Sequence, residues 1–278
     1  MSTVTISAQD INKLRQATGA GMMDCRKALT ETNGDFEAAI DWLRKQGQKV
    51  AAKRSDREAK EGVVIAQTSA DKKTGFVVCI SCETDFVSKN AEFVAFAKSI
   101  ADAAVANNVK SVEELNEVTV KGAKVADLIN DKLAAIGEKI GISRFERIEA
   151  PYVASYIHGA NRMGVLVGLS KDAEEAGKDV AMQIAAMNPV AVDAASVPAE
   201  VVAREKDIIV ELMKQDPKMA GKPDEMISKI AEGKMNAFFK EQTLLAQAFV
   251  KDGSKSVGEF LKSAGDVTVT EFKRVALG

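Results

Sequence analysis

The chain has 278 residues, of which 46% are hydrophobic and 28% charged, and its net charge is −2 with a pI near 5.7. This composition is typical of a folded protein of two or three domains and excludes a disordered chain. The mild negative charge also argues against nucleic-acid binding. No segment approaches the ~20 apolar residues of a membrane span. The first ten residues, MSTVTISAQD, have neither the basic start nor the apolar core of a secretion signal. We therefore expect a cytoplasmic protein that does not bind membranes.

Residues 1–47 are expected to form a module of three short helices with a small core, which would be marginal in isolation. The second helix is expected from Met22 to about Thr32, and the third is expected to end at Gly47. The ends of these helices are indicated by individual residues: Ser7 and Asp10 form a capping box before the first helix, Gly19 and Gly21 form the turn after it, Gly34 ends the second helix and Asp35 caps the third.

A basic run, Arg44 to Lys60, follows with seven Lys or Arg against two acids. We interpret residues 48–61 as a solvated charged linker, because charge runs without an apolar period usually are. A local nucleic-acid contact is the alternative.

A strand, a turn and a helix are expected next. The apolar run from Phe76 to Cys82 predicts a buried strand, and an apolar stripe over residues 93–104 predicts an amphipathic helix that Ser88 or Asn90 would cap. Phe86 belongs to neither pattern: it either folds back into the core or is an exposed anchor. The strand places Cys79 and Cys82 on opposite faces, and we interpret both as plain buried thiols rather than zinc ligands.

The chain repeats itself from Gly62 onward. GFVVCIS (75–81) corresponds to GVLVGLS (164–170) at an offset of 89, and ISRFERIEA (142–150) corresponds to VTEFKRVAL (269–277) at an offset of 127. The difference of 38 places an insertion in the second copy. We predict an α+β protein with two homologous subdomains, residues 62–150 and 151–278.

The insertion, at about residues 188–240, is expected to be an antiparallel helical hairpin. QDPKMAGKP would form its turn, and arms of ~17 residues would project about 25 Å. Its apolar stripes either pack on each other, the favoured interpretation, or bind a partner. The stripes are Val201, Val202, Ile208, Ile209, Leu212 and Met213, and then Met226, Ile227, Ile230, Phe238 and Phe239.

No pattern in the sequence indicates an enzyme. The single Gly-x-Gly, Gly19 to Gly21, lies between two helices and lacks a third glycine, and no GxxxxGK[ST] phosphate loop occurs. The single histidine, His158, has no nucleophile in its motif. We expect a binding protein that needs neither a cofactor nor a metal ion.

Four stretches, taken in order, resemble bacterial elongation factor Ts, the guanine-nucleotide exchange factor of elongation factor Tu. They are LRQATGAGMMDCRKALTETNGDFEAAIDWLR, CETDFVSKN, SYIHGANRMGVLV and GKPDEMISKIAEGKMNAFFKE. The departures are small: Glu83 stands where Gln is also common in the family, and the hairpin turn is a few residues longer than in some members. The resemblance implies an N-terminal module similar to ubiquitin-associated domains, a two-part core and a helical hairpin.

The resemblance also implies roles for individual residues. Thr84, Asp85, Phe86 and Val87 would intrude into the GTP-binding domain of elongation factor Tu and displace its Mg²⁺. The further partner contacts would come from Arg15, Met22 and Met23 in the N-terminal module and from His158 and Gly159 in the second repeat.

The implied function is to bind elongation factor Tu in its GDP-bound and nucleotide-free forms and to leave when GTP binds, without touching nucleotide. A homodimer is left open. Two alternatives also stay open: an adaptor that binds through residues 1–47, and an enzyme with a site around His158.

Overall fold

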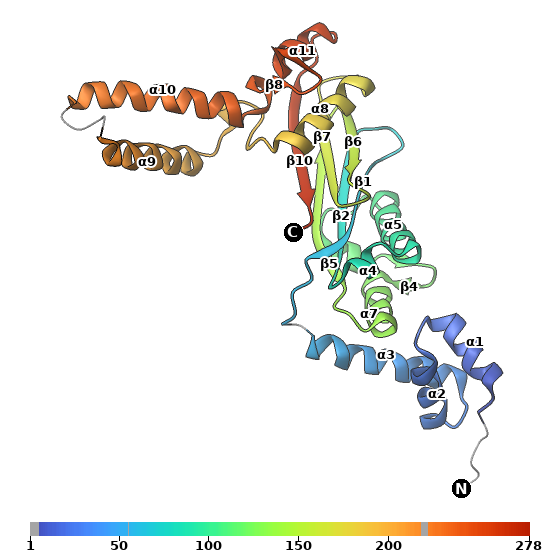
Figure 1. Ribbon diagram of the computed structural model, residues 1–278. Coiled ribbons are helices and arrows are strands. Elements are labelled where there is room, and N and C mark those ends of the chain that lie inside the picture. The colour runs from blue at the N-terminus through green and yellow to red at the C-terminus, as the bar shows by residue number, and fades with distance from the viewer. Residues whose placement is uncertain (1–5, 55, 218–221) are drawn as a thin grey trace.

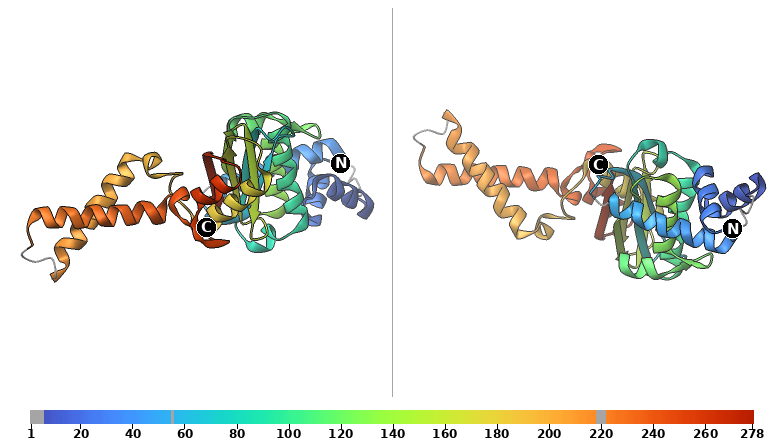
Figure 2. Two further views of the ribbon diagram at one scale, coloured as in Figure 1. Left: turned by 90° about the horizontal axis from the view of Figure 1, so that it is seen from above. Right: turned by 90° about the horizontal axis from the view of Figure 1, so that it is seen from below.

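A computed structural model describes residues 6–54, 56–217 and 222–278. The molecule is elongated: a group of N-terminal helices lies at one end, β-sheets with covering helices occupy the middle, and a pair of long helices projects at the other end (Figure 1). Two further views show the same separation of the ends (Figure 2).

Three helices, α1 (Ala8–Thr18), α2 (Met22–Glu31) and α3 (Phe36–Lys53), form the N-terminal group. The expected caps are confirmed, because Ser7 and Asp10 form a capping box and the Asp35 carboxylate accepts from the Ala38 amide at 2.9 Å. Gly19 ends α1 with φ 71°, a left-handed conformation that suits glycine. The buried residues between these helices form a small separate core: Ile11, Leu14, Ala20, Cys25, Ala28, Leu29, Ala39 and Leu43.

The predicted end of the third helix at Gly47 is wrong, since α3 continues to Lys53. Gly47 instead lies against helix α7 (Val125–Ile136), and a Cβ atom placed on it would be 2.7 Å from the Cβ of Ala134. The glycine therefore allows two helices to approach closely. Residues 48–53, expected as linker, belong to this helix.

The first sheet is antiparallel, in the order β1-β2-β5, and its apolar outer face is covered by α5 and α7. The side chain of Asn90, just before the first residue of α5, accepts from the amides of Glu92 and Phe93, so Asn90 and not Ser88 is the cap. The elements are β1 (Glu61–Thr68), β2 (Thr74–Cys82), α4 (Asp85–Ser88), α5 (Ala91–Ala106), α6 (Val112–Glu117), β3 (Thr119–Val120), β4 (Ala123–Lys124), α7 and β5 (Gly141–Glu149).

The second sheet has the order β10-β7-β6 and is covered by α8 and α11. The repeated segments 75–81 and 164–170 correspond to the central strands β2 and β7. The second repeated pair, 142–150 and 269–277, corresponds to β5 and β10. The elements are β6 (Tyr152–His158), β7 (Met163–Leu169), α8 (Glu174–Met187), β8 (Ala248–Phe249), β9 (Asp252–Ser256), α11 (Val257–Ser263) and β10 (Val269–Ala276).

The two sheets pack against each other through their inner faces. Val64, Val77, Leu166 and Val275 are among the buried residues between them. Gly75 also lies here: a Cβ on it would be 2.7 Å from Val153. The expected alternation in β2 is confirmed, because Cys79 faces the second sheet and Cys82 faces the helices. Both are free, buried thiols.

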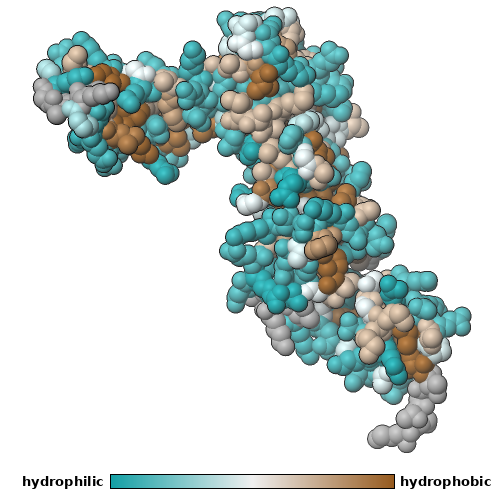
Figure 3. Space-filling view, in the orientation of Figure 1, coloured by the Kyte–Doolittle hydropathy of each residue, from teal (hydrophilic) through white to brown (hydrophobic). Residues whose placement is uncertain are grey.

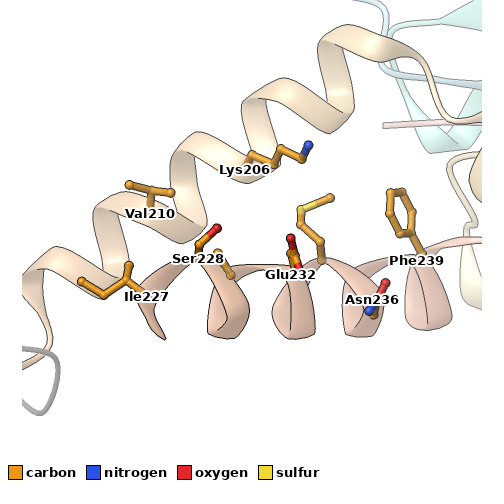
Figure 4. Close-up of a pocket in the computed structure, with 9 residues that line it drawn as sticks. Lys206, Val210, Ile227, Ser228, Glu232, Asn236 and Phe239 are labelled. Atoms are coloured by element: carbon orange, nitrogen blue, oxygen red, sulfur yellow. The ribbon is translucent and has the colours of Figure 1, made fainter. Parts of the chain in front are cut away.

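The projecting pair is α9 (Ala199–Gln215) and α10 (Asp224–Gln242), which pack on each other around Ile209, Met213 and Met235. Part of the expected turn, 218–221, lies outside the described residues. Apolar side chains gather along this hairpin (Figure 3). A groove of about 530 Å³ stays open between the two helices: Val210 of α9 lies opposite Ile227 of α10, and Phe239 of α10 lines the other end (Figure 4).

The hairpin begins and ends beside α8. Ala191 and Thr243 form a parallel bridge, and the amide of Val190 donates to the carbonyl of Gln242 at 2.8 Å. A 3-10 turn stands on each side, Ala194–Ser196 and Leu244–Ala246. In the described part of the chain, no helix is long and apolar enough to cross a membrane.

Candidate functional site

Phe86 is the most exposed large apolar side chain of the described residues, at 85%. It lies in the first turn of the four-residue helix α4, directly after β2. Its neighbour Val87 packs against the first core, whereas Phe86 points away from it. Of the two possibilities for Phe86, packing into its own core is therefore wrong.

The carboxylate of Glu138 holds the chain just before Phe86. It accepts hydrogen bonds from the amides of Glu83 and Thr84, both at 3.1 Å, and from the Thr84 hydroxyl at 2.6 Å. Glu138 follows Gly137, which ends α7 with φ 78°. The hydroxyl of Thr84 is thus engaged within the chain. Sequence reasoning missed Glu138 because no local pattern relates it to a turn more than 50 positions earlier.

The carboxylate of Glu83 connects the same turn to the end of the basic run. Its two oxygens lie 3.0 Å from Arg54 and Arg57, and it also accepts from the amide of Lys139 at 2.6 Å. The hydrogen bond from this amide, followed by those from Arg57 and Arg54, lowers the pKa of Glu83 to about 2. These arginines are therefore in ion pairs rather than in the solvated linker that the sequence predicts.

Asp85 lies beside Phe86 on the exposed side of α4. Lys89 Nζ is 2.7 Å from its carboxylate, and this hydrogen bond and the charge of Lys89 lower the pKa of Asp85. The group is ionised at neutral pH. The turn therefore presents an aromatic ring next to a negative charge.

The N-terminal turn lies on the other side of a cavity from Phe86. The cavity measures about 310 Å³, and its walls include Gly19 of the α1–α2 turn together with Phe86, Lys132 and Ile136. Met22 and Met23 follow that turn and are 49% and 73% exposed, and Arg15 is also exposed. The fold thus brings Gly19 of TGAGMM and Phe86 of TDFV, two sites that were expected separately, to one cavity.

His158 and Gly159 do not line this cavity. They stand at the exposed turn between β6 and β7, where Gly159, Ala160 and Asn161 all have positive φ. The Nδ1 atom of His158 is 3.0 Å from the Tyr156 hydroxyl. The carbonyl of Asn161 accepts from the Val64 amide at 2.7 Å, so this turn is attached to the first sheet.

The three cysteines offer no reactive thiol near this surface. Burial, and then the charges of Glu138 and Glu61, raise the pKa of Cys82 to about 12. Burial also raises the pKa of Cys25 and Cys79. Among the residues with described positions, no group of three or more His, Cys, Asp or Glu side chains is placed to hold a metal ion.

An exposed aromatic ring at a cavity, and exposed methionines such as Met22 and Met23, are typical of a protein-binding surface. Comparison with known proteins assigns the family. The family model described as "Elongation factor TS" matches residues 83–278. Proteins named "Elongation factor Ts" from Christiangramia forsetii and Flavobacterium psychrophilum are 48% and 47% identical, each over at least 98% of both chains. One from Methylococcus capsulatus is 44% identical over 99% of this chain and 93% of its own. The chain belongs to the elongation factor Ts family.

Proposed function

We propose that this protein is the guanine-nucleotide exchange factor of elongation factor Tu, acting in the cytoplasm during translation elongation. It binds elongation factor Tu in the GDP-bound form, displaces Mg²⁺, promotes GDP release and leaves when GTP binds. One observation carries the proposal: Phe86 is 85% exposed on a turn that internal hydrogen bonds hold in place. Such a ring is suited to enter a partner rather than its own core.

Phe86 is proposed to work as one part of a larger contact. Nanomolar retention of a nucleotide corresponds to about −12 kcal/mol, whereas burying one phenylalanine contributes roughly 1.5–3 kcal/mol. We assign the Mg²⁺-displacing role to Thr84, Asp85, Phe86 and Val87. The engaged hydroxyl of Thr84 and the packing of Val87 on the first core indicate that these two residues support the turn, while Asp85 and Phe86 face the partner.

The remaining binding energy comes from surfaces on either side. Met22 and Met23 are exposed just after Gly19, which lines the same cavity as Phe86, and with the exposed Arg15 they would press on the same partner domain. His158 and Gly159 would hold the partner at a second place, because they lie on the turn between β6 and β7. We propose residues 1–47, 62–150 and 151–278 as the units that carry these contacts.

Thermodynamic linkage makes the effect mutual: nucleotide weakens binding of the factor as strongly as the factor weakens binding of nucleotide. Either nucleotide can therefore expel the factor. The protein accelerates exchange in both directions and leaves the overall equilibrium unchanged.

The test is the release of a fluorescent GDP from elongation factor Tu at fixed Mg²⁺ with excess unlabelled GDP. We expect fast release with wild-type protein and release at least tenfold slower with Phe86→Ala, about 1.4 kcal/mol or more of lost coupling. Met187→Ala is the control, since Met187 is a 46% exposed apolar side chain on α8. Wild-type rates for a folded Phe86→Ala protein would contradict the mechanism, and no acceleration by wild-type protein would contradict the function.

A further inference from the structure

The end of α7 connects both parts of the surface around Phe86. On one side, α7 packs against α3 of the N-terminal group at Gly47 and Ala134, and Arg44 pairs with Asp131 at 3.5 Å. At its end, the Gly137 turn directs Glu138 to the chain before Phe86. Helix α7 therefore fixes the position of the N-terminal helices and the position of the turn before Phe86.

Glu138 accepts hydrogen bonds that fix both the position and the direction of the chain just before Phe86. One oxygen receives two successive backbone amides, those of Glu83 and Thr84, and the other receives the Thr84 hydroxyl. Successive amides normally point to different sides of an extended chain, so their convergence on one oxygen defines the turn into α4. Helix α4 has only four residues, and the Thr84 side chain does not cap it. Its orientation depends on contacts from elsewhere in the fold.

We propose that Glu138 is a positioning residue for nucleotide exchange: it holds the turn so that Phe86 is presented at the cavity that Gly19 of the α1–α2 turn also lines. Glu83, through Arg54 and Arg57, is the second attachment of the same turn. The inference rests on the proposed function of Phe86. It assigns to Glu138 no contact with the partner.

Two substitutions of Glu138 distinguish the effect of its hydrogen bonds from the effect of its negative charge. In Glu138→Gln, the amide oxygen can accept the two backbone amides while the amide nitrogen donates to the Thr84 oxygen, so the bonds are kept in number. In Glu138→Ala, all three are lost. We expect Glu138→Ala to slow GDP release from elongation factor Tu about tenfold, and Glu138→Gln to stay within about threefold of wild type.

The double variant Glu138→Ala/Phe86→Ala tests whether the effect passes through Phe86. If it does, Glu138→Ala adds nothing to the loss caused by Phe86→Ala. Glu175→Gln, at an exposed carboxylate in the first turn of α8, is the control and should behave as wild type.

Amide hydrogen exchange separates positioning from a general loss of structure. In Glu138→Ala, the amides of Glu83 and Thr84 should exchange faster, while those paired between β1 and β2 stay protected as in wild type. Equal loss of protection in β1 and β2 would overturn the proposal.

The kinetic outcomes are also distinct. Wild-type release with Glu138→Ala, or an equal further loss in the Phe86→Ala background, would overturn the positioning role and leave the proposed function standing. Wild-type release with Phe86→Ala would remove the proposed mechanism, and the positioning role with it.

Discussion

Glu83 illustrates how a single residue in this protein makes stability depend on pH. Its pKa is lowered to about 2 in the folded state, from an ordinary value of 4.5. A lowered pKa stabilises the fold above about pH 4.5, and this contribution is lost as the pH falls towards 2. We expect Glu83→Gln to lower the free energy of unfolding by about 1–2 kcal/mol at pH 7, because its charge-assisted bonds are partly screened at half-exposed Arg57.

Urea unfolding at pH 7, 4 and 3 measures the effect. The difference between wild type and Glu83→Gln should be largest at pH 7 and smaller at each lower pH. Exposed Glu175→Gln is the matched control. A difference that does not vary between pH 7 and pH 3 would contradict the pairing.

In the sequence, Phe86 fits neither the strand pattern before it nor the helix pattern after it. In the structure its side chain is exposed. The sequence did not indicate Glu138 or the arginines of the basic run. Their partners come from distant parts of the chain, and charge runs with no local period look the same whether paired or solvated.

Helix α3 and helix α10 each contain a glycine. The structure predicts that adding a side chain destabilises the protein at one of these glycines and stabilises it at the other. A Cβ on Gly47 would be 2.7 Å from Ala134, whereas a Cβ on Gly233 would meet nothing within 4 Å. Gly47→Val should destabilise the packing of α3 on α7 by about 1–3 kcal/mol through overpacking. Gly233→Ala should stabilise α10 by about 0.5–1 kcal/mol through helix propensity.

Thermal unfolding followed by circular dichroism measures both changes. Gly47→Val should also slow GDP release from elongation factor Tu, because the α1–α2 turn would move away from Phe86. A Gly47→Val protein with wild-type stability would contradict the close helix contact.

The same glycine shows what limits prediction at this scale. Capping boxes and strand periods depend on neighbours in sequence, and those predictions for Ser7 and for β2 hold. A helix-stopping glycine and a helix-packing glycine look alike in sequence. Only the position of α7, more than 70 residues later, distinguishes them for Gly47.

The whole molecule contains separate apolar cores, and the hairpin has its own. We expect that replacing residues 193–238 by a flexible linker of about six residues leaves the two sheets folded, because Phe239, whose carbonyl accepts from the amide and hydroxyl of buried Thr243, is kept. The free energy of unfolding of the remaining chain should change by less than about 1 kcal/mol, since the carbonyl of Glu241 still accepts from Gln247. Helical circular dichroism should fall by the share of α9 and α10.

The measurement is denaturant unfolding of the shortened chain, with the full chain as control. A single transition at the same denaturant concentration is expected. Loss of a cooperative transition would show that the hairpin contributes to the core. At this scale the internal repeat was the informative signal, because the matched segments form the central strands of both sheets.

The parallel bridge between Ala191 and Thr243 means that the chain leaves the body and returns to it at one place. Equal numbers of residues can therefore be added to both arms or removed from them without any change in the sheets. Each added residue per arm would extend the tip by about 1.5 Å. The reach of the molecule at this end can vary among relatives while the geometry around Phe86, in the middle of the molecule, stays constant.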